Sequence, residues 1–171
     1  DVWTDNPARG WIGVVGKDKT GMVFTPEYKR ILTYYNWFGD IGGTSEWRFV
    51  PVKINCGESF ATSFFIQPFQ GLDEINGAGE TLAGSVSLPE KGKAKITLIA
   101  SEKKTVNVEM EYIQDGKKDT VKLPEKKTLE LQPDMATDIE VSLSDMKKGI
   151  VLRVIITDMN GKFLADLLKP L

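Results

Sequence analysis

Short runs in which apolar and polar residues alternate fill the second half of the chain. The clearest run is 105–112, where Val106, Val108, Met110 and Tyr112 occupy every second position. A period of two places such residues on one face of a β-strand, whereas an amphipathic helix needs apolar residues every three or four positions. The same alternation predicts further strands at 95–99, 119–123, 128–131, 138–143 and 149–157. The last of these is the most apolar, so we expect it to be central in its sheet.

Turn-forming residues separate these predicted strands. Gly, Pro, Asp and Asn gather at 114–117, 123–125, 132–134 and 158–161. About seven short strands, spaced roughly 8–12 residues apart, are typical of an immunoglobulin- or fibronectin-like β-sandwich. A single cysteine cannot form the inter-sheet disulfide of antibody domains, so the prediction is a sandwich of another kind.

The first 75 residues also predict strands. Residues 10–16 and 22–25 flank a turn and predict a hairpin. Further strands are predicted at 28–38, at 46–54 with an edge or bulge at Pro51, and at 60–67 ending at Pro68, with a glycine-rich loop at 39–45. No stretch predicts an amphipathic helix, so the expected fold is all-β throughout.

Composition changes near residue 75. Fourteen of the sixteen aromatic residues precede residue 72, and the later part is rich in lysine. The segment 71–80 is rich in Gly, Asn, Asp and Glu, as expected of a linker or an inter-domain segment. We therefore predict two units: an aromatic-rich antiparallel β unit at 1–75 and an immunoglobulin- or fibronectin-like β-sandwich at 82–171.

Composition also excludes several kinds of site. The chain has no histidine, which rules out Ser-His-Asp and Cys-His nucleophile pairs and histidine metal sites within it. The single cysteine, Cys56, excludes cysteine-only zinc sites and favours an inert thiol. A net charge of −2 argues against nucleic acid, and no apolar run is long enough for a membrane span. We predict no catalytic residues, metal or cofactor.

One cluster has the residue types of a binding site. Residues 34–47 combine aromatic rings, acids, an amide and glycines, and the candidate ligand-binding residues are Tyr35, Trp37, Asp40, Glu46 and Trp47. Aromatic rings stack on the apolar C–H face of a sugar, while carboxylates and amides bind its hydroxyls. Packing in a core or an interface is the alternative for the tryptophans, and exposed turn residues the alternative for the acids. An acid–base pair formed by Asp40 and Glu46 is a third interpretation.

Six segments of the first unit look like the late strands of the galactose-mutarotase-like β-supersandwich. They are residues 10–15, 24–27, 37–39, 43–47, 57–60 and 66–68. The resemblance implies a sugar-associated sheet, of which this chain would hold the C-terminal portion, followed by an appended sandwich. The family's epimerases use a histidine acid and a glutamate base, and this chain offers no histidine for that pair. The start without methionine agrees with a processed or truncated product.

Two functions are therefore expected. The first is a non-catalytic sugar-binding or C-terminal accessory region with carbohydrate as its ligand. The alternative is a structural or protein-interaction module of two β units without a small-molecule ligand. An incomplete sheet predicts exposed edges that pair with another copy or with a missing N-terminal segment. A location outside the cytoplasm is slightly favoured.

Overall fold

The computed structural model describes residues 2–5, 7, 10–39, 42–114, 120–122, 126–143 and 149–171. Within these residues the chain is all-β, as predicted. In this described part of the chain, fifteen strands form four sheets whose paired strands run antiparallel, and the one helical element is the short 3-10 turn η1 (Tyr28–Arg30).

Two three-stranded sheets come from the first seventy residues. One has the order β1-β4-β5 and comprises β1 (Val2–Asp5), β4 (Ile31–Gly39) and β5 (Gly42–Phe49). The other has the order β2-β3-β6 and comprises β2 (Ile12–Val15), β3 (Thr20–Pro26) and β6 (Phe64–Gln70). The antiparallel pairing of β2 with β3 confirms the predicted hairpin.

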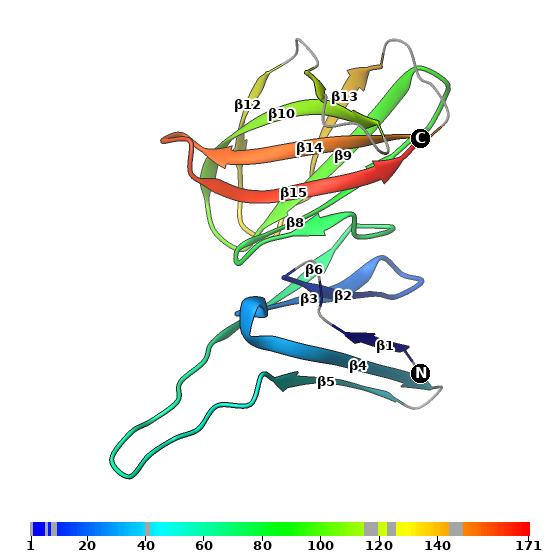
Figure 1. Cartoon of the computed structure of the whole chain (residues 1–171). Coiled ribbons are helices and arrows are strands. Elements are labelled where there is room, and N and C mark those ends of the chain that lie inside the picture. The colour runs from blue at the N-terminus through cyan, green and yellow to red at the C-terminus, as the bar shows by residue number, and fades with distance from the viewer. Residues whose placement is uncertain are drawn as a thin grey trace.

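The strand boundaries around the glycine-rich region differ from the prediction. β5 begins at Gly42, inside the predicted loop, and ends at Phe49, so the predicted strand at 46–54 is wrong beyond that residue. Residues 50–63 contain no regular strand and form a long connection that leads to β6 (Figure 1). β6 continues through Pro68, which its edge position allows, because a proline there removes no hydrogen bond inside the sheet.

The second half of the chain builds two larger sheets. The first has the order β13-β9-β8-β7 and comprises β7 (Gly77–Ala78), β8 (Leu82–Ser87), β9 (Lys93–Ala100) and β13 (Thr137–Ser142). The second has the order β11-β10-β14-β15, with β12 also paired to β10, and comprises β10 (Lys104–Gln114), β11 (Thr120–Lys122), β12 (Lys127–Leu131), β14 (Ile150–Asp158) and β15 (Phe163–Pro170). β14 lies between β10 and β15, as its apolar sequence predicts.

The main hydrophobic core fills the space between these two larger sheets. On β14 the alternate residues Leu152, Val154 and Ile156 are fully buried in it. On β9 the same core receives Ile96 and Leu98. The alternate apolar residues of these strands therefore face the core between the two sheets. The two sheets form a sandwich, which is the upper part of Figure 1.

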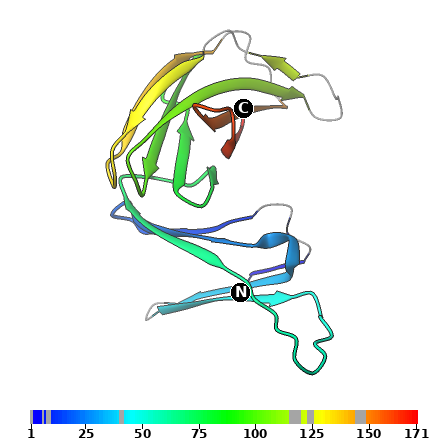
Figure 2. The same ribbon diagram turned by 90° about the vertical axis from the view of Figure 1, so that its left-hand side faces the viewer.

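A second, smaller core joins the two halves of the chain. It contains Val23 and Phe69 from the β2-β3-β6 sheet, Leu72 from the segment between the halves, and Ala83 and Ile99 from the β13-β9-β8-β7 sheet. In Figures 1 and 2 the two larger sheets lie together in the upper part of the protein, the β2-β3-β6 sheet lies below them, and the β1-β4-β5 sheet is outermost at the bottom. The predicted linker is thus packed where it leaves β6.

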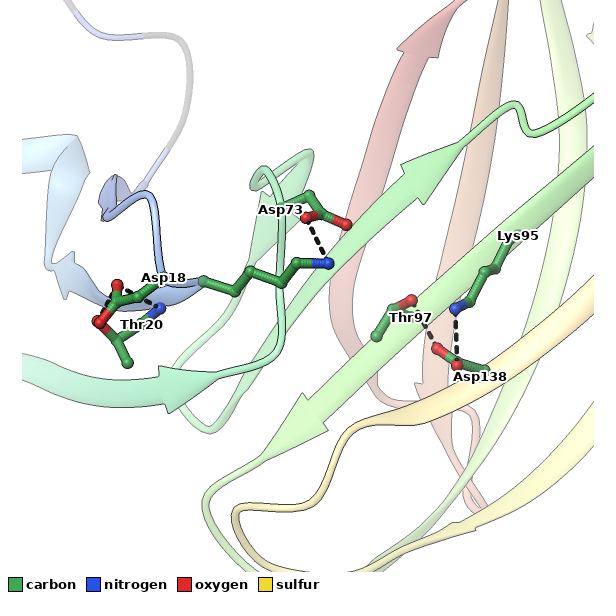
Figure 3. Close-up of polar contacts among 7 residues, drawn as sticks. Asp18, Thr20, Asp73, Lys95, Thr97 and Asp138 are labelled. Carbon is green, nitrogen blue, oxygen red and sulfur yellow. Dashed lines mark hydrogen bonds and ion pairs between the residues drawn. The ribbon is translucent and has the colours of Figure 1, made fainter.

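Polar contacts reinforce this junction. The Thr25 hydroxyl donates to the Gly79 carbonyl oxygen at 3.0 Å, and the Gln67 amide donates to the Ile99 carbonyl oxygen at 3.1 Å. At the β2–β3 turn, Lys19 forms an exposed ion pair of 2.8 Å with Asp73, which Figure 3 shows. The exposed pair contributes less than the buried contacts, because water screens its charges.

Candidate functional site

The outer face of the β1-β4-β5 sheet gathers three aromatic rings. Tyr35 and Trp37 are two residues apart on β4, so their side chains point to the same side. Trp3 of β1 lies directly opposite Tyr35 in the strand register, and the two ring centroids are 4.4 Å apart with a tilt of 35°. Trp3 is 59% exposed and Trp37 is 41% exposed. We call these three residues the aromatic platform.

Polar side chains surround the platform on the same face. Glu46 of β5 pairs with Tyr35 in the register and is exposed. Arg48, also exposed, pairs with Thr33, whose hydroxyl donates to the Asp5 carboxylate at 2.9 Å. The face therefore offers both carboxylate acceptors and guanidinium donors next to exposed rings.

Trp47 lies on the opposite face of the same sheet. It pairs with Tyr34 and points toward the β2-β3-β6 sheet, where its ring centroid is 5.3 Å from that of Phe64 and 6.4 Å from that of Phe24. The structure therefore separates Trp47 from Tyr35, Trp37 and Glu46. Its environment is the packing between two sheets, which was the alternative to ligand stacking.

Tyr34 shares this inner face with Trp47. Its side chain is almost fully buried, and its hydroxyl has no hydrogen-bond partner among the described residues. Burial raises the pKa of Tyr34 to about 12, because the phenolate form loses its hydration. The inner face is therefore suited to packing, and the outer face to ligand contact.

The remaining candidate, Asp40, lies outside the described residues. Trp3, in the short strand Val2–Asp5, was not among the candidates. Its role in the platform depends on pairing between β1 and β4, residues about thirty positions apart, which a local pattern does not reveal.

The arrangement can hold an extended ligand by stacking and hydrogen bonding. Exposed aromatic rings present flat apolar surfaces, and the neighbouring carboxylates and guanidinium supply directional bonds. In the described part of the chain no three His, Cys, Asp or Glu side chains come together as a metal site. The same residues include no helix long and apolar enough to cross a bilayer.

Comparison with known proteins adds no assignment. No protein-family model matches the chain, and no curated protein matches its sequence.

Proposed function

We propose that this chain binds carbohydrate, as a binding region and not a catalytic one, and that the aromatic platform is the contact surface. The supporting observation is the Trp3–Tyr35 ring pair, with Trp37 beside it, on an exposed sheet face. Apolar rings left in water cost free energy, which a sugar's C–H face relieves on stacking. The exposure of Trp3 and Trp37 on this sheet face favours a polysaccharide chain or surface over a small enclosed ligand.

Affinity gel electrophoresis tests this proposal. The chain is run through gels containing soluble glucans, xylan or mannan, and its retardation is measured. A pair of stacked aromatic rings contributes about 0.5–1.5 kcal/mol beyond buried area, and we take the same range for a ring stacked on a sugar. Trp3→Ala and Trp37→Ala should therefore each weaken binding roughly three- to tenfold.

Phe65→Ala provides the matched control, since Phe65 is 41% exposed, as is Trp37, but belongs to β6. It should migrate like the wild-type chain. Two results would contradict the platform as the sugar site. In one, the two tryptophan variants are retarded as strongly as the wild type; in the other, Phe65→Ala abolishes the retardation.

The finer fold assignment belongs to the same proposal. In the second half, β8, β9 and β13 form one sheet and β10, β14 and β15 the other. An immunoglobulin-like sandwich likewise has its first, second and fifth strands on one sheet and its third, sixth and seventh on the other. Its fourth strand lies on the first sheet, whereas β11 and β12 here pair with β10 on the other sheet. For the first half we propose the C-terminal portion of a galactose-mutarotase-like supersandwich, supported by its aromatic, glycine-interrupted antiparallel strands.

A second candidate function, protein interaction, is favoured by the edge strand β6. Phe64, Phe65 and Ile66 are each at least two-fifths exposed on this strand, which ends the order β2-β3-β6. Apolar edge strands pair readily with another strand. Light scattering on the wild-type chain and on Ile66→Lys tests it: a dimer that the substitution dissociates supports pairing with a second copy, and a monomer at every concentration contradicts it.

A further inference from the structure

A cleft of about 770 Å³ lies between the two halves of the protein, away from the aromatic platform. Its first wall is the corner where β3 ends and η1 begins, together with Trp11. Its second wall consists of the β7–β8, β9–β10 and β14–β15 turns of the larger sandwich. The volume falls within the range of about 300–1,000 Å³ that is usual for small-ligand sites.

One hydrogen bond joins the two walls of this cleft, and a close backbone contact lies within the second wall. The Thr25 hydroxyl bonds the Gly79 carbonyl oxygen across the junction. Gly79 also lies so close to β15 that an added Cβ would stand 2.1 Å from the Leu164 carbonyl oxygen. Only glycine allows this approach, which holds the β7–β8 turn against β15 in the second wall.

Four charged groups of the cleft, Glu27, Glu102, Lys104 and Asp166, form ion pairs. Lys104 forms an ion pair of 2.9 Å with Glu102 and a hydrogen bond to the Thr81 hydroxyl. Asp166 is paired with Arg153 at 3.0 Å, while Glu27 is paired with Arg30 at 3.3 Å. These pairs leave polar groups that can bond a ligand, without a strong net charge of either sign.

Three groups in the lining, on Asp158, Lys104 and Glu80, have hydrogen-bonding capacity. Asp158 accepts hydrogen bonds from the backbone N–H groups of Asn160 and Lys162, both at 2.8 Å, so its carboxylate is held in the β14–β15 turn. Lys104 has three N–H donors, and Thr81 and Glu102 take two of them, which leaves one for a ligand. Glu80, exposed in the β7–β8 turn, offers acceptors.

Aromatic surfaces also border the cleft. Trp11 is half-buried and packs against the smaller core that joins the halves, so its ring is held in place. Tyr28 packs against Gly10, where an added Cβ would lie 2.6 Å from its ring. Phe163 is 54% exposed and stands in the lining where β15 begins.

We propose that this cleft is a second binding site and that its ligand is a short neutral oligosaccharide. Aromatic faces, fixed hydroxyl-binding donors and acceptors, and internally paired charges fit a ligand that is rich in hydroxyls and carries no charge. A polyanion gains little there, because Lys104 is already paired with Glu102, and Glu80 and Asp158 add negative charge to the lining. The site goes beyond the proposed function of the platform, with which it shares no residue.

The test is a titration of the ¹⁵N-labelled chain followed by NMR. The probes are neutral β-1,4-linked hexasaccharides of glucose, mannose and xylose, and hexagalacturonate as the anionic counterpart. We expect at least one neutral probe to shift the amide signals of Gly79, Glu80 and Phe163, with little dependence on salt, because no net charge is neutralised.

Phe163→Ala is the informative variant and Met159→Ala its control, because Met159 is 58% exposed in the same β14–β15 turn but does not line the cleft. Phe163→Ala should weaken the neutral probe roughly three- to tenfold, while Met159→Ala leaves its affinity unchanged. Trp37→Ala should not alter this affinity, so failure of the platform and failure of the cleft give different results. The proposal is overturned if no neutral probe shifts the cleft amides or if hexagalacturonate binds there more tightly. It is also overturned if Phe163→Ala and Met159→Ala have the same effect on the affinity for the neutral probe.

Discussion

Replacing Leu72 with alanine removes a side chain that lies between the two halves of the protein. Leu72 is completely buried, in the smaller core that also contains Val23, Phe69 and Ile99. The chain around it is held on both sides: the Gly71 N–H donates to the Lys19 carbonyl oxygen at 2.8 Å, and the Asn76 N–H donates to the Gly84 carbonyl oxygen at 2.9 Å. The segment therefore has little freedom to close over the space that the substitution leaves.

The expected cost combines lost burial with a cavity. Burying a leucine side chain contributes about 1.5–3 kcal/mol, and a cavity that does not collapse brings Leu→Ala changes to about 2.7–5 kcal/mol. For Leu72→Ala we expect the free energy of unfolding to fall by about 3–4 kcal/mol.

Urea unfolding followed by circular dichroism measures this change, provided that the m-value stays constant. Leu32→Ala is the matched control, because Leu32 is 38% exposed on β4, and it should lose less than about 1 kcal/mol. A loss below about 1 kcal/mol for Leu72→Ala itself would show that the smaller core does not hold the two halves together.

Three further substitutions test the polar groups. Tyr34→Phe removes a buried hydroxyl that lacks a partner among the described residues, so stability at pH 7 should be unchanged or rise by about 1 kcal/mol. The pKa of Tyr34 is raised to about 12, so in the unfolded chain this tyrosine ionises at a lower pH than in the folded protein. The stability of the wild type should therefore fall between pH 10 and pH 12. The same alkaline loss of stability in Tyr34→Phe would contradict this. The hydrogen bond from Lys95 lowers the pKa of Asp138; desolvation opposes this shift, and the hydrogen bond from Thr97 adds to it. Asp138→Asn should therefore lower the free energy of unfolding by at most about 1 kcal/mol at pH 6. This difference in stability between the wild type and Asp138→Asn should vanish as the pH falls through the lowered pKa of Asp138. A difference that grows in acid would contradict a lowered pKa. Glu111→Ala, which removes the buried partner of Arg153 at 3.0 Å, should cost about 2–4 kcal/mol in urea unfolding, and a loss below about 1 kcal/mol would contradict a structural role for the pair.

The strands of the larger sandwich could be predicted because most bury a single face. In β13 and β14 the buried residues fall at alternate positions, which is the signal that the sequence shows. β8 was not predicted, because both of its faces are covered: Leu82 and Val86 pack in the main core and Ala83 packs in the smaller one. A strand buried on both sides has no alternation to detect.

The region after β5 shows the opposite error. Val50, Val52 and Ile54 alternate with polar residues or proline, yet all three are about half exposed and belong to no strand. Alternation marks a strand only where a neighbouring strand supplies hydrogen bonds, and Pro51 lacks an N–H to donate.

The candidate site was predictable in part for a similar reason. Tyr35 and Trp37 belong together because they are two residues apart on one strand, whatever the neighbouring strands do. The placement of Trp47 and Glu46 depends on the register between β4 and β5, and a slip of one residue would exchange their faces. Trp3 joins the site through β1, whose pairing with β4 no local pattern encodes.

The central claim is that sugars bind the outer face of the β1-β4-β5 sheet through Trp3 and Trp37. The most direct measurement is ¹⁹F NMR on the chain labelled with 5-fluorotryptophan, in which the four tryptophans give separate signals that single Trp→Phe variants assign. A soluble polysaccharide that retards the chain in affinity gels is then added. The account predicts that the Trp3 and Trp37 signals shift while that of Trp47, packed against Phe64 on the inner face, does not. A shift of Trp47 without Trp3 and Trp37 would contradict it.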